Sequence, residues 1–359
     1  MASTKKRNGK IDFLKFIFAL IVLIHHSRYV VGDKHSLFLG GSLAVEFFFL
    51  VSGYLMMASI QRMQQRPVSL GAETGAFLLK KYKSFCPEII ISYIIAFAVT
   101  YIGGKTGFFK LFASSYSDVL LIGMTGLRVK SVNGAIWYLS SMLLSMAILY
   151  PLLRKFGDTA LHIIIPVGSL LLLGWFCGNG KSPRNPSSWI GWTYRGNLRA
   201  LAELGIGACL YPIVEKIKKI DFTVLGRILL TAVEYACYGL VIYYMYRKTA
   251  SRLDYFCILV FALGLIISFS QKSIDTALFS GRFFSWLGKF SFSIYLNHHF
   301  YSINMDKFFP DRSSKELLVI YYGLSLLTAL VVMGLSDLIR KVGGGLGVKL
   351  KLVKKPSDV

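Results

Sequence analysis

The sequence is poor in charged residues, and poorest in acidic ones. Only 16% of its 359 residues are charged, and Asp and Glu together number 18. Soluble domains carry roughly 25% charged residues, so a soluble fold of this length would lack the polar surface that it needs. Because 54% of the residues are hydrophobic and the mean hydropathy is +0.56, the composition indicates a membrane protein. Spanning segments must satisfy their own backbone groups, which predicts an all-α fold.

Paired cysteines and several common catalytic motifs are also missing. The five cysteines stand singly in or beside apolar runs, and none has C-x-x-C spacing, which argues against a disulfide framework and a zinc site. The chain has no G-x-S-x-G, no H-E-x-x-H and no phosphate-binding glycine loop. We therefore expect no metal site and no bound cofactor. The glycines at 343–345 are interpreted as a flexible linker.

Long apolar runs, in contrast, recur along the whole chain. A hydrocarbon core of roughly 30 Å needs about 20 helical residues, and runs near this length predict a polytopic membrane protein of about ten transmembrane helices. The expected spans are 13–31, 41–60, 85–103, 135–153, 160–177, 198–214, 222–246, 254–271, 283–303 and 316–338. The sixth and ninth are the least apolar. The run 119–125 is too short to span and is predicted to be interfacial or re-entrant. A single membrane domain fills residues 1–359.

The net charge of +23 has a topological explanation. In a soluble protein it would suggest nucleic acid, but here Lys and Arg flank apolar runs, so we expect the lipid bilayer and no nucleic acid as partner. The loops on the side of the two termini carry more of these residues, including Lys80–Lys83 and a basic tail over about 340–359. The positive-inside rule therefore predicts that both termini are cytoplasmic.

Ionisable residues inside the predicted spans are candidates for function, since burying charge in a bilayer is costly. Lys15 and His26 are eleven residues apart, so they share one helix face about 16 Å apart along the axis. With ten helices, a further set maps to the same outer half of the membrane as His26: Glu46, Trp137, Arg199, Glu203 and His298. A histidine beside a carboxylate suits a general base that deprotonates a hydroxyl.

Structural explanations compete with this interpretation. Lys15 could reach the head groups as a snorkelling side chain, and His26 could hydrogen-bond within the bundle. Arg199 and Glu203 could form only an i,i+4 ion pair. Intramembrane His, Glu and Arg also build proton relays, so a proton-coupled transporter of a glycan or small metabolite is the alternative function. Against it, the chain shows no inverted repeat.

Several segments in order resemble the acyltransferase-3 family, bacterial membrane O-acyltransferases of surface glycans. Lys15 followed by ten residues and His26 is similar to the family's basic-x10-His signature, with Lys in place of the usual Arg, which loses the bidentate fork. Four further matches resemble family segments: Val45–Leu55, the stretch opening at Ile136-Trp137, Arg199–Gly205, and Leu287–His298, where Asn297 replaces the usual aromatic. Lys80–Pro87 resembles a basic turn associated with the donor's phosphates, although positive-inside anchoring explains it equally well.

The resemblance implies an acyl-CoA donor, acetyl-CoA by default, and a glycan or lipid-linked sugar acceptor in the bacterial cytoplasmic (inner) membrane. The donor's phosphates would meet Lys80, Lys81 and Lys83, with Lys15 along its path. His26 would be the general base and Glu46 its orienting carboxylate or a second proton acceptor, while His25 remains an alternative base. Trp137, Arg199, Glu203 and His298 would shape the acceptor site or stabilise charge. Direct transfer and an acyl-enzyme both stay open.

Overall fold

The computed structural model describes residues 7–32, 37–63, 69–127, 131–179, 185–247 and 251–353, with side chains up to residue 342. Within these residues nearly all regular structure is helical, and the exception is a short antiparallel pair of strands, β1 (Trp189–Ile190) and β2 (Thr193–Tyr194). The predicted all-α class is confirmed. The basic residues Lys5, Lys6 and Arg66 and the end of the basic tail lie outside the described part of the chain.

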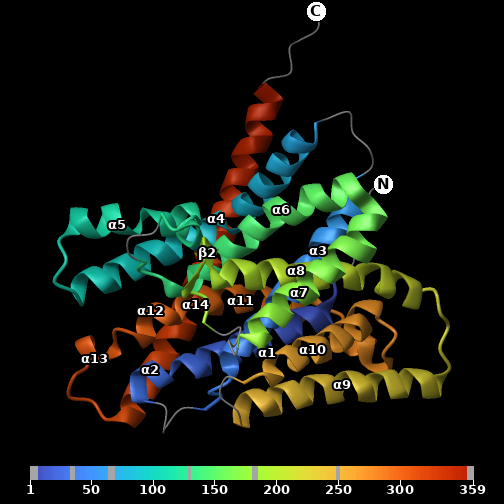
Figure 1. The fold of residues 1–359 in the computed structure, drawn as a ribbon. Helices are drawn as coiled ribbons and strands as arrows, with labels where there is room; N and C mark the ends of the chain where they lie inside the picture. Colours follow the sequence, from blue (N-terminus) through green and yellow to red (C-terminus); the bar gives the residue numbers. More distant parts are fainter. Residues whose placement is uncertain are drawn as a thin grey trace, which may run out of the picture.

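The helices fall into two groups by length. The long ones are α1 (Gly9–His26), α3 (Ala44–Arg62), α4 (Leu70–Ile102), α5 (Phe108–Leu120), α6 (Trp137–Thr159), α7 (Ile165–Gly178), α8 (Arg195–Ile217), α9 (Val224–Arg247), α10 (Leu253–Ser270), α11 (Arg282–Asn297) and α14 (Ser314–Val353). Three helices have one turn each: α2 (Arg28–Val31), α12 (His299–Ser302) and α13 (Met305–Phe308). Figure 1 shows their arrangement.

Seven segments of the described chain are long and apolar enough to cross a membrane: Gly9–Val31, Gly41–Arg62, Leu70–Ile102, Gly134–Gly178, Val224–Arg247, Leu253–Ser270 and Ser314–Val342. They contain eight of the ten expected spans, because the fourth and fifth share Gly134–Gly178. Gly157 breaks that segment between the two, with φ 47° and ψ −120°, a conformation that favours glycine. The sixth and ninth expected spans form α8 and α11, which are more polar. The number of crossings and the sidedness of the termini stay predictions.

Two local expectations are wrong. The stretch Lys80–Pro87 is not a turn, since α4 runs continuously from Leu70 to Ile102 with Pro87 inside it. The Ser69 side chain accepts a hydrogen bond from the Ala72 N–H at 3.3 Å and starts this helix well before the apolar run. Likewise, α14 continues through the glycines at 343–345, so they are not a linker. Tertiary packing and helix continuity override weak local signals in both places.

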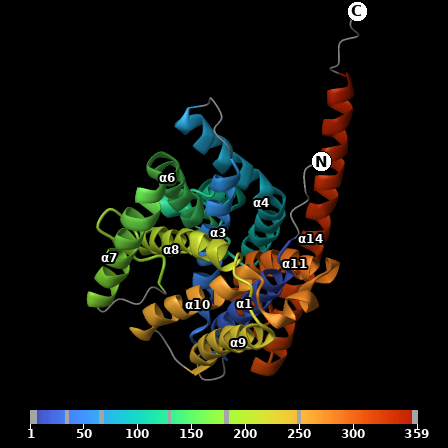
Figure 2. The same ribbon diagram turned by 90° about the vertical axis from the view of Figure 1, so that its right-hand side faces the viewer.

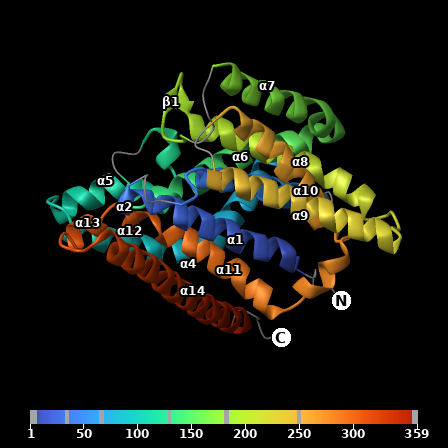
Figure 3. The same ribbon diagram turned by 90° about the horizontal axis from the view of Figure 1, so that it is seen from below.

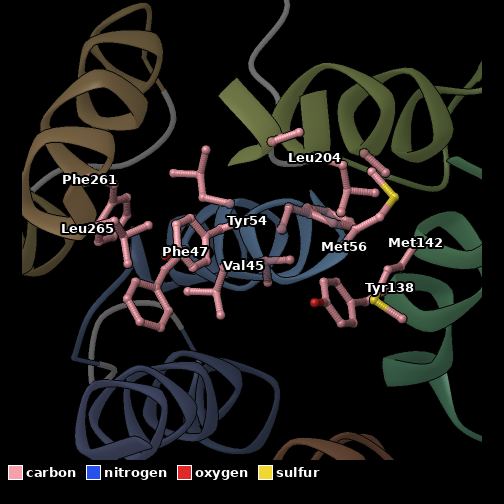
Figure 4. Close-up of a cluster of buried hydrophobic side chains, with 14 of the residues drawn as sticks. Val45, Phe47, Tyr54, Met56, Tyr138, Met142, Leu204, Phe261 and Leu265 are labelled. Atoms are coloured by element: carbon pink, nitrogen blue, oxygen red, sulfur yellow. The ribbon is translucent and has the colours of Figure 1, made fainter. Parts of the chain in front are cut away.

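The core is organised around α3. Its side chains contact α10 on one side and α6 and α8 on the other, as Figure 4 shows for Phe47 and Tyr54 of α3, Phe261 of α10, Leu204 of α8 and Tyr138 of α6. On the other flank, α1 packs against α11, and α11 packs against α14 (Figure 3). The helix α1 therefore has packed neighbours over much of its length, which fixes the positions of its polar side chains.

Two glycines bring α3 and α8 into close contact. A Cβ at Gly53 would overlap the Leu204 carbonyl, and a Cβ at Gly207 would overlap the Leu50 carbonyl. Small residues at such crossings let helix backbones approach, as in other membrane helix pairs. Because these contacts fix the crossing of α3 and α8, they also fix how residues nearer the start of each helix meet.

The N-terminal end of α1 is anchored separately. The Lys10 ammonium lies 2.8 Å from a Glu234 carboxylate oxygen and 2.5 Å from one of Asp275, and it is 6% exposed. Burial raises the pKa of Asp275, but the hydrogen bonds from Lys10 and Tyr235 outweigh it and the net direction is downward. These contacts join α1 to α9 and to the segment before α11, so α1 is held at this end as well as along its sides.

The two ends of the bundle differ. The first half of α4 and the last turns of α14 both project, apart from each other, on the side where α1 begins, whereas α2, α12 and α13 gather at the opposite end (Figures 1 and 2). Lys80, Lys81 and Lys83 lie on the projecting part of α4. This division matters for the polar residues below, because it separates those near His26 from those near Lys15.

Candidate active site

A cavity of about 730 Å³, called here the outer cavity, lies at the end of the bundle where α2 and α12 gather. It is within the size range of small-molecule sites. Its walls come from the ends of α1 and α11, the starts of α6 and α8, and the short helices α2 and α12. The lining residues include His25, His26, Arg28, Trp137, Asn185, Arg195, Arg199, Tyr295, His298 and His299. His26, Trp137, Arg199 and His298, distant in the sequence, therefore share one cavity.

His26 ends α1 with a defined tautomer. Its Nδ1 lies 2.9 Å from the Val22 carbonyl oxygen, and since a carbonyl only accepts, Nδ1 carries the proton and donates. The lone pair is then on Nε2, which is the arrangement a general base needs. The His26 ring centroid lies 4.7 Å from that of His298 and 5.2 Å from that of His299.

His298 repeats this arrangement on α11. Its Nδ1 donates to the Tyr295 carbonyl oxygen at 2.8 Å, while its buried Nε2 has no hydrogen-bond partner among the described residues. Within the same part of the chain, the buried Nδ1 of the neighbouring His299 has none either. His25 lines the cavity too, with its Nδ1 2.9 Å from the Phe38 carbonyl oxygen and its ring edge-on to that of His26 at 5.0 Å between centroids. Among the residues that the structure describes, no group of three or more potential ligands could hold a metal ion.

Arg199 binds two carboxylates beneath the cavity. Its Nη2 lies 2.6 Å from Glu46 Oε1, and its Nε lies 3.0 Å from Glu46 Oε2 and 3.1 Å from Glu203 Oε1. All three side chains are at most 1% exposed. The guanidinium carbon also lies 5.5 Å from the centre of the Trp137 ring. The i,i+4 pair with Glu203 is therefore present, but it belongs to a buried network that joins α3 to α8.

This geometry contradicts one of the two roles expected for Glu46, that of orienting His26, while its role as a second proton acceptor stays a prediction. Its carboxylate oxygens pair with Arg199, while the proton on His26 goes to the Val22 carbonyl. The Val22 carbonyl, one helical turn before His26, thus orients the imidazole. A backbone carbonyl often fixes the tautomer of a histidine in this way. Glu46 acts on the cavity indirectly, because it fixes the position of Arg199, which lines the wall.

A second cavity of about 210 Å³, called here the inner cavity, lies further toward the N-terminal end of α1. Lys15 and Lys81 line it together with aromatic and small side chains, among them Phe48, Ser52, Phe85 and Tyr138. Lys15 is tethered at its mouth, with its Nζ 3.5 Å from Asp12 Oδ1. Lys80 and Lys83 are exposed on other faces of α4. The structure therefore groups Lys81 with Lys15 and separates Lys80 and Lys83 from them.

Tyr295 borders both cavities. It belongs to both sets of lining residues, and its hydroxyl donates to the Ala135 carbonyl oxygen at 3.1 Å. Its ring packs edge-on against Tyr138 at 5.6 Å between centroids and lies 5.8 Å from the ring of His298. Tyr138 is itself held by a hydrogen bond to the Phe48 carbonyl at 3.1 Å and by contact with the Ser52 hydroxyl at 3.0 Å. Two tyrosines thus separate the cavities.

Two supporting residues were missed in the sequence. Asp118 accepts hydrogen bonds from the backbone N–H groups of Val132 and Asn133, at 2.9 and 3.1 Å. The Asn133 amide in turn donates to the Leu296 carbonyl oxygen at 2.9 Å, next to His298. Neither residue stands in a long apolar run, and only polar residues inside such runs were considered as candidates for function. The predicted run 119–125 ends α5 and includes a short helical turn, 123–125, close to this network.

A family model described as an acyltransferase domain matches residues 8–337, nearly the whole chain. The chain belongs to the acyltransferase-3 family. It is therefore a membrane acyltransferase in general terms, and both cavities lie inside the matched region. No curated protein and no solved structure matches the chain.

Proposed function

We propose that this acyltransferase moves an acyl group, acetyl by default, from acyl-CoA to a hydroxyl of a cell-surface or exported glycan in the bacterial inner membrane. The observation that carries the proposal is the pair of cavities that meet at Tyr295. The smaller one offers two lysines at the end of the bundle where α4 and α14 project. The larger one offers imidazole bases at the opposite end.

The donor suits the inner cavity. Lys15 and Lys81 place positive charge where the phosphates of acyl-CoA would pass, and the aromatic side chains deeper in suit its apolar arm. Lys80 and Lys83, on exposed faces of α4, would contribute to the field around the mouth rather than hold the donor. The thioester would end beside Tyr295, at the boundary with the outer cavity.

The acceptor suits the outer cavity, with His26 as base. His26 Nε2 takes the proton from the acceptor hydroxyl, whose oxygen attacks the thioester carbonyl carbon. The tetrahedral intermediate collapses as the C–S bond breaks, and the imidazolium returns the proton to the departing thiolate. The products are an ester and CoA with a free thiol. Arg199, held by Glu46 and Glu203, and His298 shape the wall around this reaction.

Label transfer from radiolabelled acetyl-CoA to crude surface glycan tests the proposal, with purified protein in nanodiscs. We expect wild type to transfer label, and His26→Ala to lose roughly 100-fold to 10,000-fold of the rate, the usual contribution of a general base. His162→Ala is the matched control, since His162 is exposed on another helix. Equal transfer by His26→Ala would exclude His26 as base. Failure of wild type with several acyl-CoAs, together with proton-driven glycan flux, would favour the transporter.

A further inference from the structure

Among the residues that the structure describes, the side chains of permanent charge that line the outer cavity are all arginines. Three arginines line it, Arg28, Arg195 and Arg199, together with four histidines. Among the described residues of this lining, none is Asp or Glu. A neutral sugar needs donors and acceptors in balance, whereas a cavity lined in this way is complementary to a ligand that carries negative charge.

The three arginines do not have the same role. Arg199 is 1% exposed and its guanidinium is paired with Glu46 and Glu203, so its role is to hold α3 and α8 together. Arg28 and Arg195 are half-buried and come from different elements, the first residue of α2 and the first residue of α8. They line the cavity from two separate elements, so an anionic ligand in it would meet a guanidinium on more than one wall.

The wall around Arg195 is built in advance. The N–H groups of Arg195 and Gly196 donate to the carbonyl oxygens of Ser188 and Pro186, at 2.9 and 3.0 Å. These bonds tie the segment 185–188, part of which lines the cavity, to the start of α8. Asn197 next to them donates to the Met124 carbonyl oxygen at 2.7 Å. Arg195 therefore projects from a fixed backbone, which reduces the conformational freedom lost when its side chain binds an anion.

Arg28 and Arg195 lie where the positive-inside rule predicts few basic residues. Basic residues are depleted from the outer ends of membrane helices, and the outer cavity lies at the end that the loop charges assign to the outside. Topology explains the lysines of α4 and the tail. Arg28 and Arg195 stand instead in the wall of the outer cavity, where an anionic ligand would contact them.

We propose that the acceptor is an anionic glycan, with a carboxylate or phosphate close to the acylated hydroxyl and bound by Arg28 and Arg195. The inference rests on the proposed function, since it names the class of acceptor for the same site. Guanidinium forks pair with either group in two-pronged fashion, so the chemistry shared by a uronic acid and a sugar phosphate is what the cavity selects.

The first test uses surface glycan from the producing cells and radiolabelled acetyl-CoA, with products separated by charge. We expect the label on anionic glycan. Reduction of the glycan carboxyl groups beforehand abolishes labelling if carboxylate is recognised, and chemical removal of phosphate abolishes it if phosphate is recognised. Label on neutral glycan, or labelling that survives both treatments, overturns the inference and leaves the acyltransferase function standing. Absence of label on any glycan removes the function and the inference with it.

The second test uses Arg195→Gln and Arg28→Gln, with Arg312→Gln as the control. Arg312 is exposed, pairs with Glu316 at 3.4 Å and lies outside both cavities. Loss of one charged hydrogen-bonding partner should raise the acceptor KM roughly tenfold to a hundredfold. The native and charge-depleted glycans should then become equally poor acceptors for Arg195→Gln, and Arg195→Lys should recover part of the preference. Equal loss toward both glycans, with their ratio kept, would mean a structural role only and overturn the inference.

Discussion

The outer and inner cavities use cationic side chains in opposite ways. In the outer cavity, Arg199 is locked by two buried carboxylates, and the wall is completed by histidines whose protons are fixed by backbone carbonyls. In the inner cavity, Lys15 and Lys81 border aromatic side chains, and the Lys15 Nζ lies 3.5 Å from Asp12 Oδ1. The outer cavity is thus a rigid polar site, and the inner cavity is an apolar slot with cations at its mouth.

That difference indicates a division of labour. A rigid site with defined tautomers suits bond making, because preorganised groups need little rearrangement during reaction. An apolar slot bordered by two lysines suits the capture of a long anionic molecule with an apolar arm. The substitutions below alter the two regions separately, and the largest effect is expected in the outer one.

Arg199→Met should break the outer site. It leaves Glu46 and Glu203 buried without their cation, and breaking a buried pair in this way costs about 3–5 kcal/mol. We expect a large fall in the thermal unfolding midpoint in detergent, together with loss of activity. The matched change Arg312→Met removes an exposed pair and should cost less than about 1 kcal/mol. Similar unfolding midpoints for the two variants would show that the buried network does not hold α3 to α8.

Tyr295→Ala should connect the two cavities. It removes the side chain that borders both, so water from the outer cavity would reach the thioester. We expect the ratio of acetyl-CoA hydrolysis to label transfer to rise several-fold. Tyr295→Phe keeps the ring and loses only the bond to the Ala135 carbonyl, so its ratio should stay near that of wild type. A ratio unchanged in Tyr295→Ala would mean that the boundary lies elsewhere.

The smallest effects should come from single lysines of the inner cavity. Lys81→Gln removes one half-buried charge from the inner cavity, and the KM for acetyl-CoA should rise roughly twofold, as for one partly solvated charge pair. Lys80→Gln and Lys83→Gln, on exposed faces of the same helix, serve as controls and should change that KM little. The acceptor KM should not change in any of the three. Equal effects at all three positions would indicate a diffuse electrostatic contribution instead of a binding cavity.

Most of the fold could be predicted from apolar runs, because bilayer-spanning helices leave a strong signal in composition. The positions that failed are those where continuity depends on local capping and packing. Ser69 starts α4 before its apolar run, and the glycines at 343–345 do not interrupt α14. The helices α8 and α11 have the weakest apolar signal because they contain more polar residues. Arg199 lies on α8 and His298 directly follows α11, so the least apolar segments carry the site.

The site was predictable to the level of which residues meet, but not what each one contacts. Helix periodicity and the order of the spans brought His26, Arg199 and His298 together. The pairing of Glu46 with Arg199 instead of His26 depends on the crossing of α3 and α8 at Gly53 and Gly207, which the sequence does not reveal. The separation of Lys81 from Lys80 and Lys83 has another cause. It depends on which face of α4 each lysine occupies, because only one face borders the inner cavity.

Sealed vesicles test most directly whether the two cavities serve different substrates from opposite faces. Protein of known orientation is reconstituted, with radiolabelled acetyl-CoA confined to one side and glycan to the other. We expect label transfer when acetyl-CoA is on the side where α4 and α14 project and glycan is on the opposite side, and none with the sides exchanged. Equal transfer when both substrates are restricted to a single face would contradict the arrangement of a donor cavity and an acceptor cavity that meet at Tyr295.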